Sequence, residues 1–93
     1  MVAERELEFT RTDGSAELCR VVLNRPVQEG SDGPWCCSYS IEAQTFQRKS
    51  RAAGEDSLQS LILAQRVLAV ELQALAQEKN GSFTWFGQTD LGL

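Results

Sequence analysis

Apolar and polar residues alternate along the first half of the chain, which is the pattern of strands that bury one face. Residues 4–11 place Leu7 and Phe9 on one face and three glutamates on the other. An Asp-Gly pair follows and favours a tight turn, because glycine tolerates a positive φ. Residues 16–25 and 35–43 repeat the alternation, so the sequence predicts three strands, the first two joined as a hairpin.

Two further segments complete the predicted strands. Residues 45–52 are predicted to be a separate strand, because a single strand of about 18 residues would be unusually long. Residues 82–87 are predicted to be a strand because Phe83 and Trp85 share one face. Residues 29–34 form a loop by composition, and the last six residues have no pattern.

A long helix is predicted for residues 57–79, which contain no glycine or proline and are rich in Leu, Ala, Gln and Glu. Asp56 is the expected N-cap, with Gln59 three residues later as a capping-box partner. Gly81 is expected to supply the left-handed residue that ends the helix. The predicted fold is therefore α+β: an antiparallel sheet of four to five strands with one long α-helix packed on one face. The element order is β-β-β-β-α-β, in a single domain of residues 1–93.

The predicted helix carries two apolar stripes. The wider stripe is assigned to the face that packs on the sheet, and it comprises Leu58, Leu61, Ile62, Leu68, Ala69, Leu72, Leu75 and Ala76. The second stripe lies nearly opposite and comprises Leu63, Val67, Val70 and Ala74. A contiguous apolar patch is not expected on the free side of a helix in a monomer, so the second stripe is predicted to be a homodimer contact. The alternative is that the C-terminal tail, with Leu91 and Leu93, folds over it.

Charge and composition narrow the functional classes. The chain has 93 residues, too few for a dinucleotide-binding fold or a barrel, and a formal net charge of −4. An acidic balance disfavours nucleic-acid binding, because phosphate contacts need Lys and Arg. The N-terminus has no apolar signal region, and the longest apolar run, residues 61–64, is far too short for a membrane span. The sequence thus predicts a cytoplasmic protein that binds neither nucleic acid nor membrane.

The cysteines and the lack of histidine limit the available chemistry. Cys19, Cys36 and Cys37 are an odd number without metal-binding spacing, so free thiols are predicted, with no metal and no cofactor. Without histidine, a Ser or Cys nucleophile lacks its commonest base. The glutamates of residues 4–8 fit a solvated strand face better than an acid–base pair. The sequence therefore favours a protein that is not an enzyme.

Two other sets of residues are candidate binding sites. Arg48, Lys49 and Arg51 form a basic stretch that could hold an anion, although edge protection of a strand is the favoured explanation. Trp35, Tyr39 and Trp85 share inward positions and are candidates for lining a pocket between helix and sheet.

The sequence also resembles a family of small bacterial proteins of unknown function. The resemblance covers nearly the whole chain and rests on Asn24-Arg25-Pro26, Trp35 to Ile41, Gly54 to Leu61, and the ending Trp85 to Gly87 with Asp90-Leu91-Gly92. It implies an α+β domain and a bacterial source, and no activity.

Together these features predict a non-enzymatic protein-interaction module whose partner is a second copy of itself or another protein. The alternative is a small-molecule binding domain with a pocket between helix and sheet. A small enzyme that lacks histidine is the less favoured third reading.

Overall fold

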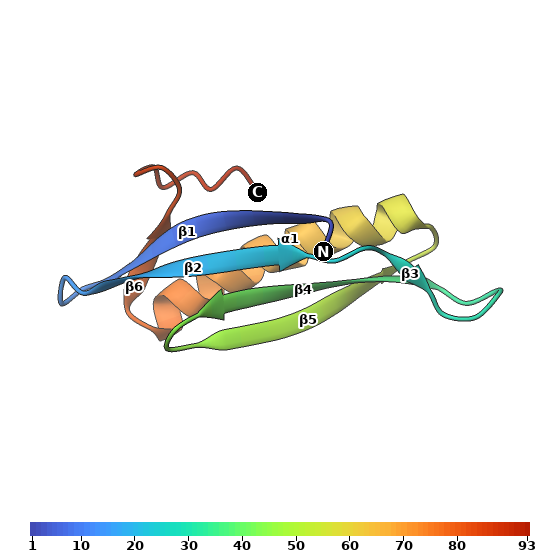
Figure 1. Cartoon of the computed structure of the whole chain (residues 1–93), viewed down its shortest axis with the longest axis horizontal. Helices are drawn as coiled ribbons and strands as arrows, with labels where there is room; N and C mark the ends of the chain where they lie inside the picture. Colours follow the sequence, from blue (N-terminus) through green and yellow to red (C-terminus); the bar gives the residue numbers. More distant parts are fainter.

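The computed structural model describes all of residues 1–93 as one sheet and one helix (Figure 1). The elements are β1 (Ala3–Arg11), β2 (Ala16–Leu23), β3 (Val27–Gln28), β4 (Trp35–Ala43), β5 (Gln47–Gly54), α1 (Ser57–Glu78) and β6 (Gly81–Thr84). The predicted α+β class and the single long helix are confirmed. The short strand β3 was not predicted, and it adds a sixth strand to the sheet.

All strand pairs are antiparallel, and the pairing defines two edges. On one side of β4 lies β5, which pairs with almost its whole length. Both β2 and β3 pair with the other side of β4, one after the other, and β1 follows next to β2. At the far edge β6 pairs with the second half of β1. The sheet therefore runs β5, β4, β2 with β3, β1, β6, with β5 and β6 as its edge strands.

The strand alternation is confirmed where it defines the core. Leu7, Phe9, Cys19 and Val21 are buried on the helix side of β1 and β2, and Cys37, Tyr39 and Ile41 on that side of β4. The three rings of Phe9, Phe46 and Phe83 pack together at one end, with centroids 4.8 to 6.3 Å apart. The strand predicted for residues 45–52 begins later and ends at Gly54, because Phe46 turns into the core and the pairing continues to Trp35.

The N-cap predicted for α1 is confirmed, whereas the residue predicted to end the helix is wrong. Asp56 Oδ1 accepts from the backbone N–H of Gln59 at 2.7 Å, and Gln59 Oε1 accepts from the N–H of Glu55 at 2.6 Å. At the other end Asn80, not Gly81, takes the left-handed conformation, with φ of 54°. Gly81 opens β6 instead. A Cβ there would lie 2.5 Å from Phe9 Cζ, so a glycine lets β6 pack directly against that ring.

The predicted helix phase was wrong in its first two turns. The buried residues of α1 are Ser60, Ala64, Leu68, Leu72 and Leu75, whereas Leu58 and Ile62 of the predicted core stripe are 63% and 41% exposed. The reason is close packing on β5: a Cβ on Gly54 would lie 2.6 Å from the backbone N of Ser60. Only small helix residues fit there. The Ser60 hydroxyl is satisfied because it donates to the Ser57 carbonyl at 2.9 Å.

The C-terminal tail packs on the β1 side of the sheet. Arg5 Nη1 donates to the Leu91 carbonyl at 2.7 Å, and the Arg5 guanidinium lies 3.8 Å from the centre of the Trp85 ring. Leu91 packs against the core cluster. The helix covers mainly β4 and β5, and the tail helps to cover the remaining side.

Candidate functional site

The most prominent unpartnered feature is the second apolar stripe of α1, Leu63, Val67, Val70 and Ala74, hereafter the flank stripe. Leu63 is half-buried and Ala74 is exposed, while Val67 and Val70 are 41% and 64% exposed. Helical geometry places this stripe roughly a quarter-turn from the buried face, not opposite to it as the sequence predicted. It is therefore a side of the helix, next to one edge of the sheet.

Contacts of the neighbouring helix residues identify that edge as β5. Ser60 lies against Gly54 at the end of β5. Glu71 accepts a hydrogen bond from the Tyr39 hydroxyl of β4, and Glu78 Oε1 lies 3.2 Å from Arg48 Nη2 of β5. These residues are adjacent to the flank stripe on the helix surface. The stripe thus lies along the outer edge of the molecule, beside a strand that pairs on one side only.

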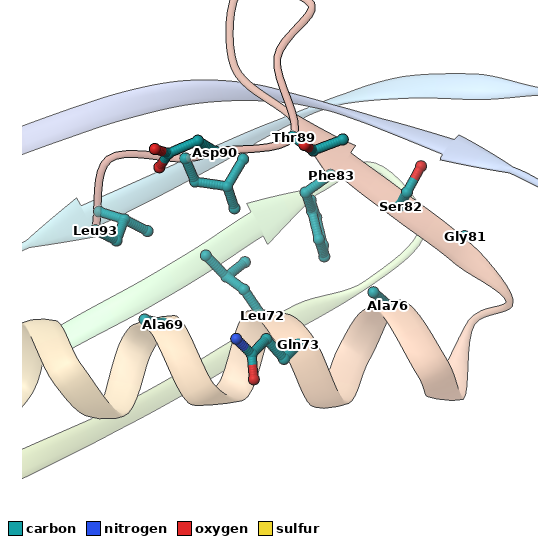
Figure 2. A pocket seen from close by; sticks show the side chains of 11 residues that line it. Ala69, Leu72, Gln73, Ala76, Gly81, Ser82, Phe83, Thr89, Asp90 and Leu93 are labelled. Atoms are coloured by element: carbon teal, nitrogen blue, oxygen red, sulfur yellow. The ribbon is translucent and has the colours of Figure 1, made fainter.

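The tail lies on the other side of the helix. A cleft of about 370 Å³ separates α1 from the tail and β6, with Leu72 and Phe83 pointing into it and Leu93 at its rim (Figure 2). Its polar rim includes Gln73 and Asp90, and one oxygen of Asp90 accepts from the Gly92 N–H. The tail therefore does not cover the flank stripe, and the alternative explanation of that stripe fails.

The basic stretch is divided by the strand alternation. Arg48 points to the helix side of β5 and pairs with Glu78, whereas Lys49 and Arg51 point to the open face. Arg51 Nη1 lies 2.8 Å from Glu29 Oε1. The pKa of Glu42 is lowered, first by the hydrogen bond from Ser40, then by Arg20, with a smaller contribution from Lys49. The three cations thus do not form one anion site; each lies near an acid of the same chain.

The three aromatic residues predicted to line a pocket are not brought together. Trp35 lies at the start of β4 in a depression with Pro26, Val27 and Leu58. Tyr39 is 1% exposed in the core, and Trp85 follows β6 at the opposite edge of the sheet. The alternation of residues along each strand correctly predicted that the three side chains share one face of the sheet. It carried no information about which strands lie next to each other.

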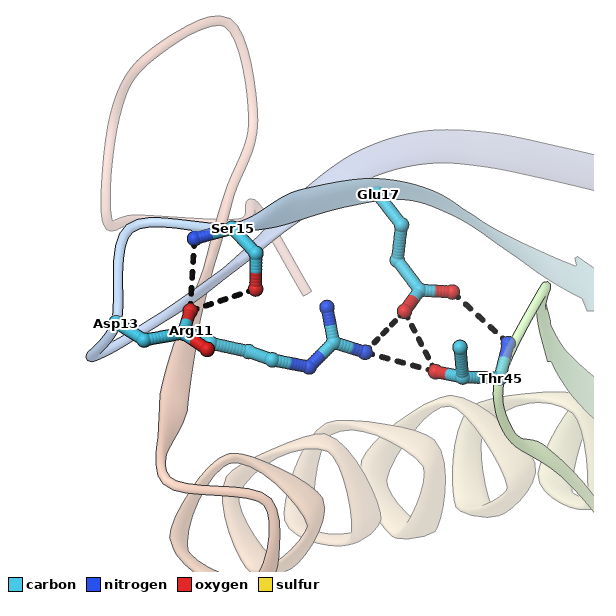
Figure 3. Close-up of polar contacts among 5 residues, drawn as sticks. All are labelled: Arg11, Asp13, Ser15, Glu17 and Thr45. Carbon is cyan, nitrogen blue, oxygen red and sulfur yellow. Dashed lines mark hydrogen bonds and ion pairs between the residues drawn. The ribbon is translucent and has the colours of Figure 1, made fainter.

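The shifted pKa values of the ionisable groups come from hydrogen bonds, ion pairs or burial within the fold. Arg11, Glu17 and Thr45 tie the β1–β2 turn to the β4–β5 turn (Figure 3). Hydrogen bonds from Thr45 and Arg11 lower the pKa of Glu17 to about 2. Burial, then the contact with Glu71, raises the pKa of Tyr39 to about 12. Burial raises the pKa of the Cys19 thiol to about 12 and also raises that of Cys37.

Sequence reasoning missed two arginines that organise the ends of β1. Arg5 and Arg11 share the inward parity of Leu7 and Phe9, and each holds a contact distant in sequence. Their charge at inward-facing positions is a usable signal, because a cation there needs a partner. Arg11 also lies 5.2 Å from the centre of the Phe9 ring.

The tip of the tail hairpin is a second missed feature. Trp85 and Gln88 form a two-way backbone pair, and the turn between them places Phe86 at φ of 50°. A bulky residue rarely adopts this conformation. The Phe86 side chain is 86% exposed beside the Trp85 ring.

By length and composition alone, α1 is apolar enough to cross a membrane. In the structure its buried face is part of the core, and a core helix of a globular domain passes the same test. This is weak evidence for a membrane span.

Comparison with known proteins identifies the family. The chain belongs to the family described as "Domain of unknown function (DUF6968)", which matches residues 3–93. No curated protein matches the chain. No solved structure matches it either.

Proposed function

We propose that this domain, a member of a family without an assigned function, is a non-enzymatic interaction module that pairs with a second copy of itself. The observation that carries the proposal is the flank stripe: four adjacent apolar residues beside an open sheet edge, without a charge among them, of which three are exposed and Leu63 is half-buried. Scattered exposed apolar residues are normal, but a continuous stripe is typical of an interface.

The stripe is complementary to itself when two helices pack antiparallel. Around a two-fold axis midway along the stripe, Leu63 faces Ala74 of the second copy and Val67 faces Val70. A large residue therefore meets a small one, and two medium residues meet each other, which is the pattern that fills a helix–helix contact. Two-fold pairs with the same patch on both copies are the commonest homo-oligomers.

Paired substitutions on opposite sides of α1 test the proposal. Val70→Glu places a charge in the flank stripe, and Leu58→Glu places one at a position of equal exposure, 64% against 63%, on the other side. Light scattering across a concentration series should show a dimer for the parent and for Leu58→Glu, and a folded monomer for Val70→Glu. A parent that is monomeric at high concentration contradicts the proposal.

A second candidate function is small-molecule binding in the cleft between α1 and the tail. It is supported by the cleft volume of about 370 Å³ and by an apolar floor that includes Leu72 and Phe83. A fluorescent apolar probe such as anilinonaphthalene sulfonate should bind the native protein at one site. Ala69→Trp fills the cleft and should abolish that binding, whereas probe binding unchanged by this variant excludes the cleft.

We also propose that the domain acts in the cytoplasm, with no membrane or nucleic-acid partner. The acidic balance of the chain and the three cysteines, which are free thiols as predicted, support this location. Fractionation of cells producing the tagged protein tests it: the expected result is recovery in the soluble cytoplasmic fraction, and recovery with membranes contradicts it.

A further inference from the structure

The flank stripe alone is too small for a stable dimer. A Leu or Val side chain removes about 100 Å² from water when it is fully buried. Three such residues and the smaller Ala74, already partly covered, supply less than about 400 Å² per copy, under half of the ~800 Å² per partner that a standard interface buries. An interface built on this stripe must therefore extend onto its neighbour, and that neighbour is β5.

We infer that the two copies join through β5 as well, so that their six-stranded sheets become one continuous twelve-stranded sheet with the two helices on the same face. This inference rests on the proposed dimer and specifies its geometry. An edge strand leaves a row of backbone N–H and C=O groups unpaired, and a second copy running antiparallel can satisfy them.

Two of the three cations of β5 form ion pairs with acids of the same chain. Arg48 reaches up to Glu78 on the helix, and Arg51 reaches back across β4 to Glu29 in the loop after β3. Lys49 lies on the same face as Glu42 and helps to lower the pKa of that carboxylate. Lys49 and Arg51 remain exposed on the open face of β5, next to the small exposed residues Ser50 and Ala53.

The register of the strand pair follows from the register of the helices. Gly54 lies beside Gln59 and Ser60, and α1 returns antiparallel to β5. At about 1.5 Å per helix residue and about 3.3 Å per strand residue, the midpoint of the flank stripe is level with Ser50. The contact from Tyr39, which pairs with Ser50, to Glu71 agrees with this level. One two-fold axis through Ser50 therefore relates both the helix pair and the strand pair. It places Lys49 opposite Arg51 of the second copy, with Glu42 and Glu29 of the same chain as the acids that offset these cations.

Disulfide trapping tests this geometry. Residues facing each other in an antiparallel pair have Cα atoms about 4.5–5.5 Å apart, within the range that a disulfide spans. In a Cys36→Ser background, Ser50→Cys should form a covalent dimer under mild oxidation. Ser82→Cys is the matched control, because Ser82 is an exposed serine on the other edge strand, β6, and it should stay monomeric.

Hydrogen exchange on the unmodified protein gives a second measurement. Amides of β5 should exchange at least tenfold more slowly at a concentration where the dimer forms than at one where it dissociates, with β6 unchanged. A dimer that Val70→Glu dissociates, but that neither traps through Ser50→Cys nor protects β5, overturns the shared sheet and leaves the proposed function standing. A monomeric parent overturns both.

Discussion

The carboxylate of Glu17 should make the free energy of unfolding of this domain fall as the pH becomes acidic. Glu17 accepts from the Thr45 N–H at 3.0 Å and from the Thr45 hydroxyl at 2.6 Å, and it pairs with Arg11. These bonds join the two hairpin ends of the sheet. They hold the pKa of Glu17 at about 2, against 4.5 for a free glutamate. The charged form is therefore favoured by the folded state.

The sign of the pH effect follows from this lowered pKa. Because the folded pKa lies below the unfolded one, the stabilisation is present above about pH 4.5 and is lost as the pH falls from there through about 2. The full shift corresponds to about 3 kcal/mol. Solvent reaches the Arg11 side chain, which is 25% exposed, and screens the pair, so we expect about 1–2 kcal/mol.

Urea unfolding of Glu17→Gln and of the parent between pH 7 and pH 2.5 measures this effect. The variant should be less stable by about 1–2 kcal/mol at pH 7, and the difference should shrink steadily with falling pH, to roughly a quarter of its pH 7 value at pH 2.5. Glu6→Gln is the control, because Glu6 is an exposed carboxylate on the same hairpin and makes no ion pair. A difference that stays constant with pH, or one equal to that of the control, would refute the reasoning.

Three further substitutions test the packing. Leu72→Ala removes a side chain that is 1% exposed and should lower the free energy of unfolding by about 2–5 kcal/mol; a urea midpoint equal to that of the parent contradicts it. Gly81→Ala adds a Cβ 2.5 Å from Phe9 Cζ and should cost about 1–3 kcal/mol in the same assay, so a neutral result would show that β6 packs more loosely. Phe86→Asn relieves a positive φ at a two-residue turn and should raise stability by about 0.5–1 kcal/mol, whereas a loss would mean that the exposed ring makes contacts worth more than the strain.

The alternating strands were predictable because their pattern is local. The buried residues of each strand are two positions apart, as with Leu7 and Phe9 in β1 and Tyr39 and Ile41 in β4. Alternation within one strand is therefore enough to predict which of its faces is buried. The N-cap at Asp56 was predictable for the same reason, since its partners lie within three residues. Strand order is not local, and for that reason the predicted pocket of Trp35, Tyr39 and Trp85 was not found.

The helix shows where periodicity stops being informative. Apolar residues lie on three sides of α1, so several rotations of the helix about its axis would bury a similar number of them. The rotation that buries the most apolar residues includes Leu58 and Ile62 on the core side. The structure chooses Ser60 and Ala64 instead, because Gly54 brings the helix so close to β5 that larger side chains do not fit. The flank stripe lies off the buried face, as the sequence predicted, but it lies beside β5 and not opposite the sheet, and this position required the tertiary structure.

The exposed stripe has a structural origin in how the sheet is covered. A sheet five strands wide is broader than one helix, so its buried face needs a second cover. In this domain the C-terminal tail covers the buried face over β1, where Arg5 bonds to the tail and Leu91 packs against the core. The helix α1 covers the other side of that face, over β4 and β5. That displacement brings one flank of the helix to the β5 edge, where no further segment of the chain follows. The same arrangement that completes the core thus leaves an apolar flank and an open strand side by side, and these are the two surfaces that the proposed dimer would use.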